Sequence, residues 1–168
     1  MALKPFETTD SIVVARPTGF GRFQAEIAVR GGVILADEPV EVGGGGTGPT
    51  PYELLSAALA ACTAMTMRLY AERKGWDLPP LRVEVAHSLQ PGTDGAPPRD
   101  LFTRHIAFDD ALDPERGAKL LEIADKCPVH RTFMRGFAVN TRLVPPSEHV
   151  PGEPAMMHEQ EMERACED

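Results

Sequence analysis

The sequence predicts a mixed α+β fold with antiparallel sheets. Three short strand patterns come first, followed by one long apolar helix pattern, a hairpin pattern, a second helix pattern and a last strand pattern. Because strands and helices do not alternate one by one, a doubly wound parallel sheet is disfavoured. The 168 residues are 42% hydrophobic and 25% charged, which is the size and composition of one globular domain with its own core.

The first strands are expected before residue 36. Residues 11–16 are rich in β-branched side chains, and apolar side chains alternate with polar ones across residues 22–30. Val33–Leu35 forms a third short apolar run. These three patterns predict three short strands at the start of the fold.

A long central helix is expected from Thr50 to about Lys74. Thr50-Pro51-Tyr52-Glu53 has the spacing of a capping box with proline at the first helical position. No charged residue lies between Glu53 and Arg68, so this helix is predicted to be buried on most sides. The glycine run 43–46 before it lacks the Gly-Lys-Ser/Thr ending of a phosphate-binding loop and predicts a turn.

The second half begins with a hairpin pattern. Apolar residues alternate over 81–86, a loop rich in proline and glycine follows at 90–99, and a second strand is expected over 101–108. Asp113-Pro114 then predicts a helix start, and the apolar spacing carries that helix to Cys127. A last strand is expected over 136–143, with a short helix near 158–165.

Charge is concentrated at the end of the chain. The formal net charge is −8, and residues 147–168 hold seven acids and one arginine. An acidic protein without a basic face is not expected to bind nucleic acid. The sequence shows neither a secretory signal pattern nor an apolar run of about 18 residues, so we expect a cytoplasmic protein with no membrane partner.

Two cysteines are the strongest chemical feature. Cys62 lies inside the long helix pattern, and Cys127 precedes Pro128. Their separation of 65 residues is too long for a CxxC pair or a zinc knuckle, so only the fold can bring them together. Cytoplasmic cysteines are reduced at rest, which makes any disulfide between them transient and catalytic. Cys166, near the end of the chain, is expected to be exposed.

Two motifs resemble those of the OsmC/Ohr family of thiol-dependent hydroperoxide reductases, in its OsmC-like branch. The first is the run from Gly44 through Thr50-Pro51-Tyr52-Glu53-Leu54-Leu55 to Ala60-Ala61-Cys62, continued by Arg68-Leu69-Tyr70-Ala71. The second is Ala124-Asp125-Lys126-Cys127-Pro128-Val129. With the β-rich start, the resemblance covers residues 10–145. It predicts a domain over residues 1–145 and leaves an acidic tail at 146–168.

The resemblance implies an intertwined homodimer with two central helices and active sites at the subunit interface. It also implies a peroxidase for organic (alkyl or lipid) hydroperoxides that needs no metal or other cofactor. Cys62 would attack the peroxide as a thiolate, and Cys127 would resolve the sulfenic acid by forming a disulfide, which a cellular dithiol reduces. This agrees with the general chemistry of thiolates and peroxides.

The sequence departs from the family where its peroxidases carry an activating glutamate. That residue lies ten positions before the first cysteine, where this chain has Tyr52. Glu53 is one position late, and at about 100° per residue it lies roughly opposite Cys62 on the helix, which suits a capping role. For the family's activating arginine we choose Arg22, with Arg16 as the second candidate. His130 and Arg131 are two further cations, just past Cys127.

The predicted substrate pocket is apolar and suits an alkyl or lipid hydroperoxide better than hydrogen peroxide. Its expected wall residues come from the long helix: Leu55, Leu59, Met65 and Met67. Other interpretations stay open. Cys62 shares a helix face with apolar residues, as a packing cysteine does, so the protein could be a non-enzymatic apolar-ligand binder or a redox sensor. A soft-metal site at Cys62, Cys127 and His130 is a third possibility.

Overall fold

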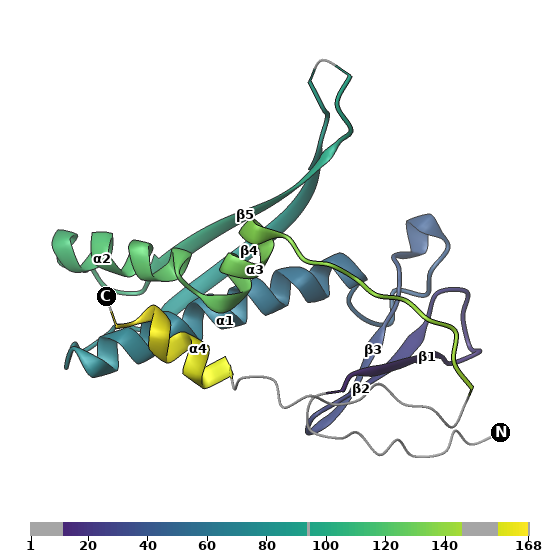
Figure 1. Ribbon diagram of the computed structural model, residues 1–168, viewed down its shortest axis with the longest axis horizontal. Helices are drawn as coiled ribbons and strands as arrows, with labels where there is room; N and C mark the ends of the chain where they lie inside the picture. Colours follow the sequence, from purple (N-terminus) through teal and green to yellow (C-terminus); the bar gives the residue numbers. More distant parts are fainter. Residues whose placement is uncertain (1–11, 94, 146–157, 168) are drawn as a thin grey trace. The chain divides into compact units, whose positions relative to one another are not determined.

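The computed structural model describes residues 12–93, 95–145 and 158–167 (Figure 1). The strands are β1 (Val14–Pro17), β2 (Ala25–Val29), β3 (Gly32–Ala36), β4 (Leu81–Gln90) and β5 (Arg99–Phe108). The helices are the 3₁₀ turn η1 (Val40–Val42), α1 (Pro51–Arg73), α2 (Pro114–Asp125), α3 (Pro128–Arg135) and α4 (His158–Ala165). The chain forms two compact units, Met1–Pro51 with Asn140–Ala155 and Tyr52–Val139 with Met156–Asp168.

The first unit contains an antiparallel sheet in the order β1-β2-β3. Ala28 pairs with Val14 on one side and with Val33 on the other, so β2 is the central strand. The three predicted strands are therefore confirmed; β1 and β2 are shorter than their patterns, and β3 extends one residue beyond its pattern at each end. Residue 11, where the first strand was expected to begin, lies outside the described residues.

The glycine run after β3 forms a turn around a buried carboxylate. Asp37 is 2% exposed, and its side chain accepts hydrogen bonds from the backbone N–H groups of Glu38 (2.9 Å), Gly45 (3.0 Å) and Thr47 (3.3 Å). The Thr47 hydroxyl donates a fourth bond of 2.8 Å. Gly46 has a φ of 62°, which favours glycine because it has no Cβ. The predicted turn is confirmed.

The second unit is built on α1 and the hairpin β4–β5 (Figure 1). Its long antiparallel register pairs Val83 with Ile106 and Val85 with Arg104. These side chains are half-buried, whereas their strand neighbours are exposed. The alternation of the sequence thus gives the hairpin one covered face and one open face.

The main core of this unit joins both long helices. Its buried members come from α1, α2 and the end of the chain: Met67, Tyr70, Leu120, Ile123, Ala124 and Cys166. By length and composition α1 could cross a membrane, with a mean hydropathy of 1.4 over its best window. A core helix passes the same test, and the wholly buried Met67, Thr63 and Thr66 show that α1 is packed as one.

Helix α4 covers part of this core. Arg73 of α1 donates to the carboxylate of Glu163 (2.8 Å) and to its backbone carbonyl (3.1 Å). Ala165 is fully buried, and Cys166 is 7% exposed. The short helix expected near 158–165 is confirmed, but the expected exposure of Cys166 is wrong, because the chain after α4 packs against α1 and α2. Burial raises the pKa of the Cys166 thiol.

Two further expectations differ from the structure. The second helix ends at Asp125 rather than at Cys127, and Pro128 opens a new helix, α3, because proline is well suited to a first helical position. The strand expected over 136–143 does not form. A strand needs a neighbouring strand to receive its backbone hydrogen bonds, and no described strand pairs with this segment.

Candidate active site

Cys62 and Cys127 meet at the start of α3. Cys127 is the N-cap of this helix, and its Sγ accepts a hydrogen bond from the backbone N–H of His130 (3.4 Å). The Sγ of Cys62, which comes from the middle of α1, accepts one from the N–H of Val129 (3.4 Å). Both cysteines belong to one buried cluster with Leu59. The fold thus brings together the two thiols that the sequence left 65 residues apart.

The start of α3 provides electrostatic help to both sulfur atoms. Cys62 lies too deep in α1 for the N-terminus of its own helix to stabilise a negative charge. The N-terminus of α3 can stabilise it instead, because its free N–H groups carry partial positive charge and point at the two sulfurs. The eight residues of α3 give it about two turns.

The two thiols affect each other's ionisation in opposite directions. A hydrogen bond from Cys62, followed by the bonds from His130 and Thr63 and the charge of Arg104, lowers the pKa of Cys127 to about 6 against the effect of burial. The same thiol–thiol hydrogen bond, followed by burial, raises the pKa of Cys62. Within the pair Cys127 is therefore the more acidic thiol and Cys62 the less acidic one.

A partly buried arginine supports the Cys127 side of the pair. One guanidinium nitrogen of Arg104 donates to the Thr63 hydroxyl (2.9 Å) and to the Ala124 carbonyl (3.0 Å). The other nitrogen forms an ion pair with Asp125 (2.6 Å). The Thr63 hydroxyl in turn lies 3.7 Å from the Sγ of Cys127. Arg104 is only 13% exposed, so its charge acts in partly desolvated surroundings.

Sequence reasoning missed Arg104 and Thr63. The available signal was strand alternation: Phe102, Arg104 and Ile106 share one face of β5, so an arginine stands where apolar residues belong. A charge at an inward position of a strand needs partners. Threonines inside helices often donate to a carbonyl one turn back, as Thr63 does to Leu59, so a threonine in this position gives no signal of its own. Thr63 could have been found only together with Arg104.

An apolar pocket of about 490 Å³ lies beside the two cysteines. Its wall contains the predicted Leu55 and Leu59 together with residues from the hairpin, α3 and the segment after it: Tyr52, Asp100, Leu101, Phe102, His130, Phe133, Met134 and Phe137. Leu59, Phe102 and Phe133 also pack in the cysteine cluster, which connects the pocket to the sulfurs. Met65 lies on the exposed side of α1, and Met67 is buried in the main core.

Tyr52, which stands ten positions before Cys62, is part of an aromatic stack at the pocket. Its ring lies parallel to that of His87, with centroids 4.0 Å apart. His87 forms a 2.7 Å hydrogen bond with Asp100 and contacts the ring of Phe102. Sequence reasoning gave His87 no role, and the structure places it behind the pocket wall.

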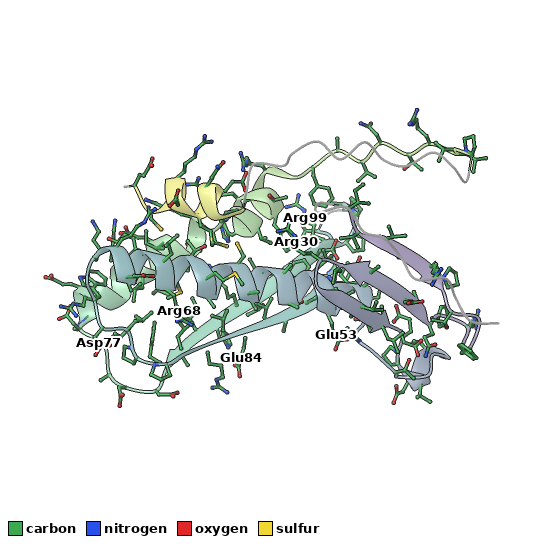
Figure 2. The ribbon with its side chains drawn as sticks, turned by 90° about the horizontal axis from the view of Figure 1, so that it is seen from below. Arg30, Glu53, Arg68, Asp77, Glu84 and Arg99 are labelled. Carbon is green, nitrogen blue, oxygen red and sulfur yellow. The ribbon has the colours of Figure 1, made fainter. Side chains whose placement is uncertain are left out.

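The remaining predicted residues are Glu53, Arg22 and Arg16. Glu53 is exposed in the first turn of α1, labelled in Figure 2, nine residues before the buried Cys62. Arg22 belongs to the first unit and lies over the ring of Phe23, 4.9 Å from its centroid. Arg16 is paired with Glu26 at 3.3 Å.

The two basic residues after Cys127 line a second, smaller pocket. His130 and Arg131 border it, and the Nδ1 of His130 lies 3.9 Å from Asp125. Within residues 12–93, 95–145 and 158–167, no group of three or more histidine, cysteine or acidic side chains is arranged to hold a metal ion.

The opposite pKa shifts of Cys127 and Cys62 predict an unusual thiolate titration. In a Cys166→Ser background, ultraviolet thiolate absorbance should rise in one step near pH 6, because Cys127 ionises below its ordinary pKa while the pKa of Cys62 is raised. Cys62→Ala removes the largest cause of the low pKa and should move that step toward about 8.5. A single step near pH 8.5 for both thiols in the parent protein would contradict the assignment.

Comparison with known proteins shows that the fold of this chain is a recognised one. A family model described as OsmC-like protein matches residues 43–142, more than half of the chain. No curated protein matches the chain.

Several solved structures are similar. The organic hydroperoxide resistance protein OsmC of Legionella pneumophila is 23% identical, with 77% of this chain and 91% of that chain covered and a TM-score of 0.57. OhrB, the organic hydroperoxide resistance protein of Bacillus subtilis, is 24% identical over 72% and 87%, with a TM-score of 0.55. An OsmC-like protein of Mycoplasma pneumoniae is 22% identical over 73% and 86%, with a TM-score of 0.56.

Proposed function

The chain belongs to the OsmC-like family, and on that premise we propose that it is a cysteine-based peroxidase that reduces organic hydroperoxides. The observation that carries the proposal is the meeting of Cys62 and Cys127 at the N-terminus of α3, beside an apolar pocket. Peroxide reduction by two thiols needs an activated sulfur and a second thiol close enough to trap the sulfenic acid.

The proposed reaction has three steps. The sulfur of Cys62 attacks the terminal oxygen of the hydroperoxide, the O–O bond breaks, and the products are a Cys62 sulfenic acid and an alcohol. The sulfur of Cys127 then attacks the sulfur of Cys62, which forms the disulfide and releases water. A cellular dithiol finally reduces the disulfide by thiol–disulfide exchange.

The pocket supports an alkyl or lipid hydroperoxide as the substrate. Its aromatic and aliphatic wall offers little to hydrogen peroxide, which has no apolar part to bury, whereas an alkyl chain gains about 0.8 kcal/mol for each CH₂ group removed from water. Leu55 and Leu59 are the proposed contacts from α1. Arg22 stays the proposed activating cation, with Arg16 as the second candidate, and Glu53 stays a candidate for the role of the family's glutamate.

We propose that the working form is a homodimer. Apolar residues lie exposed along one side of α1, with Ala58, Ala61 and Met65 among them, and the segment after α3 exposes Phe137 and Val139 by 70% and 76%. Apolar side chains exposed together along one side of a helix usually mark an interface. We propose that a second copy of this chain covers this surface. The proposed reductant of the protein is a dithiol of the cytoplasm.

The dimer makes a direct prediction. Sedimentation of the purified protein should give twice the mass of the chain, and Ala61→Glu on the exposed side of α1 should shift it toward the monomer, because a buried charge at an interface is costly. Glu84→Lys, on the open face of β4, is the control that should leave the mass unchanged. A monomeric parent protein would contradict the proposal.

The peroxidase is tested by single-turnover kinetics of the fully reduced Cys166→Ser protein with cumene hydroperoxide. Rapid loss of two free thiols per chain, much slower with hydrogen peroxide, is the expected result. If both thiols remain free, the peroxidase is contradicted and the apolar pocket would instead favour a ligand-binding protein of the same fold.

A further inference from the structure

His87 occupies an inward position of the hairpin, where the alternation of the strand places apolar residues. Val83, Val85 and His87 follow one another along the covered face of β4, and all three are half-buried. The side chain of His87 is 19% exposed. A buried polar ring costs free energy unless its nitrogen atoms find partners. The partners of His87 therefore indicate what a histidine does at this position.

The register of the hairpin provides a carboxylate for this ring. His87 pairs directly with Phe102, and Asp100 is the next residue on the same face of β5. The Nε2 of His87 lies 2.7 Å from a carboxylate oxygen of Asp100. An ionised carboxylate only accepts, so Nε2 donates in this hydrogen bond. The bond holds the imidazole in one orientation about its last side-chain torsion, which is otherwise broad.

The imidazole also contacts aromatic rings from two other parts of the site. The ring of Tyr52, in the first turn of α1, lies 4.0 Å away at an interplanar angle of 12°. The ring of Phe102 lies 4.9 Å away at 45°, and Phe102 in turn contacts Phe133 of α3 at 5.0 Å. A continuous series of rings thus connects the start of α1 with α3 through the hairpin.

These rings form one wall of the apolar pocket. Tyr52, Phe102 and Phe133 line it, and His87 supports the first two. Phe102 and Phe133 also pack against the cluster that contains both cysteines, so the wall leads to the sulfurs. Tyr52 is 48% exposed, and a half-exposed ring in a first helical turn has several accessible rotamers. Its stack on His87 favours the one that closes the wall.

We propose that His87 is a positioning residue that sets the preference of the pocket for hydroperoxides with a bulky apolar group. The inference rests on the proposed function and concerns the same pocket. Because His87 holds Tyr52 and Phe102 in place, a large group meets a wall that is already formed and does not have to order these rings when it binds. A small group covers little of the wall and gains less from it.

His87→Ala tests this role through the choice between two substrates. The measurement is kcat/KM for cumene hydroperoxide and for the smaller tert-butyl hydroperoxide, each with excess dithiol. We expect the ratio of the two values to fall by about tenfold, with the rate for tert-butyl hydroperoxide lowered by about twofold at most. A variant that merely distorts the fold or displaces the thiols would slow both substrates alike.

Further variants separate the ring of His87 from its hydrogen bond. His87→Phe keeps a ring between Tyr52 and Phe102 and should retain most of the discrimination, whereas His87→Gln keeps a donor without the ring and should lose it. Asp100→Ala removes the partner of the imidazole and should lower the ratio, and Asp100→Asn, which keeps an acceptor oxygen, should restore part of it. His105→Ala, on the open face of β5, is the matched control and should leave the ratio unchanged.

A binding measurement makes the inference independent of turnover. The alcohol 2-phenyl-2-propanol has the organic group of cumene hydroperoxide but no O–O bond, so it cannot oxidise a thiol. Titration of the reduced protein with this alcohol, followed by nuclear magnetic resonance, gives its affinity for the pocket. We expect the affinity to be about tenfold lower in His87→Ala than in the parent protein.

The outcomes distinguish the role of His87 from the peroxidase. A lower substrate ratio together with a lower affinity for the alcohol in His87→Ala supports the inference. If the ratio and the affinity equal those of the parent protein, or if both substrates slow alike, the role of His87 is overturned while the proposed peroxidase stands. If the parent protein consumes neither hydroperoxide, the proposed function is overturned, and an alcohol affinity that depends on His87 would still support its role in the pocket.

Discussion

Replacing Cys62 with serine is expected to lower the rate of organic hydroperoxide reduction by at least about 10³-fold, as the loss of a catalytic nucleophile does in other enzymes. Serine fits the buried position of Cys62 and can still accept from the Val129 N–H, so the loss would report chemistry and not folding. The measurement is cumene hydroperoxide consumption in the presence of excess dithiol, with circular dichroism to check the fold.

Cys166→Ser is the matched control for this experiment. Cys166 packs in the main core, where its Sγ contacts the Thr66 carbonyl, and not in the cluster of Cys62 and Cys127. Its removal should leave the rate within about twofold of the parent. A Cys62→Ser protein that consumes hydroperoxide at the parent rate would exclude Cys62 as the attacking residue.

Asp37→Ala is expected to reduce the free energy of unfolding by about 2–4 kcal/mol. The change removes a carboxylate, in a residue that is 2% exposed, which accepts four hydrogen bonds, three of them from the backbone N–H groups of Glu38, Gly45 and Thr47. Asp37→Asn keeps the shape and one acceptor oxygen, so its loss should be smaller. Urea denaturation of the three proteins measures both effects.

A loop that rearranges to pair these N–H groups with water would remove most of the penalty. In that case Asp37→Ala would denature at the same urea concentration as the parent protein, and the buried carboxylate would have no structural role. Thr47→Val, which removes only the 2.8 Å hydroxyl bond, separates this single contact from the backbone bonds.

The elements that could be predicted from the sequence carry strong local signals. Thr50-Pro51 marks the start of α1, and Gly75, with a φ of 64°, follows its end. The alternation in residues 81–86 is that of β4, which is covered on one face only. In each case the chemistry of a few neighbouring residues decides the conformation, so little tertiary information is needed.

What could not be predicted depends on contacts between distant residues. The segment 136–143 has the alternation of a strand but no described strand beside it, and sequence patterns do not show whether a neighbour is available. Cys166 lies in an acidic tail, yet Met67 and Leu120 provide an apolar surface on which it is buried. In both cases the local sequence does not decide the outcome, because pairing of the strand and burial of the cysteine depend on distant residues.

Some residues that the structure brings together could be named from the sequence, but the electrostatics around them could not. Cys62 and Cys127 were identified from their motifs, and Leu55 and Leu59 from the apolar pattern of α1. The Val129 N–H that donates to Cys62 was missed, because it belongs to a helix that was not predicted. Arg104 was missed because its partners, Thr63 and Asp125, come from α1 and α2, and only the fold brings the three together.

The N-cap of α3 would also link the oxidation state of the cysteines to the stability of this helix. In the reduced protein this helix begins on an anionic sulfur, and a charged acceptor at the N-terminus stabilises a helix. The proposed disulfide carries no charge, so its formation would remove that stabilisation, and the first turn of α3 should then exchange its amide protons faster. Helix α4 rests on α3, so the loosening can reach a part of the chain beyond residues 43–142. A reductase that recognised these two helices could distinguish the oxidised protein from the reduced one before touching either sulfur.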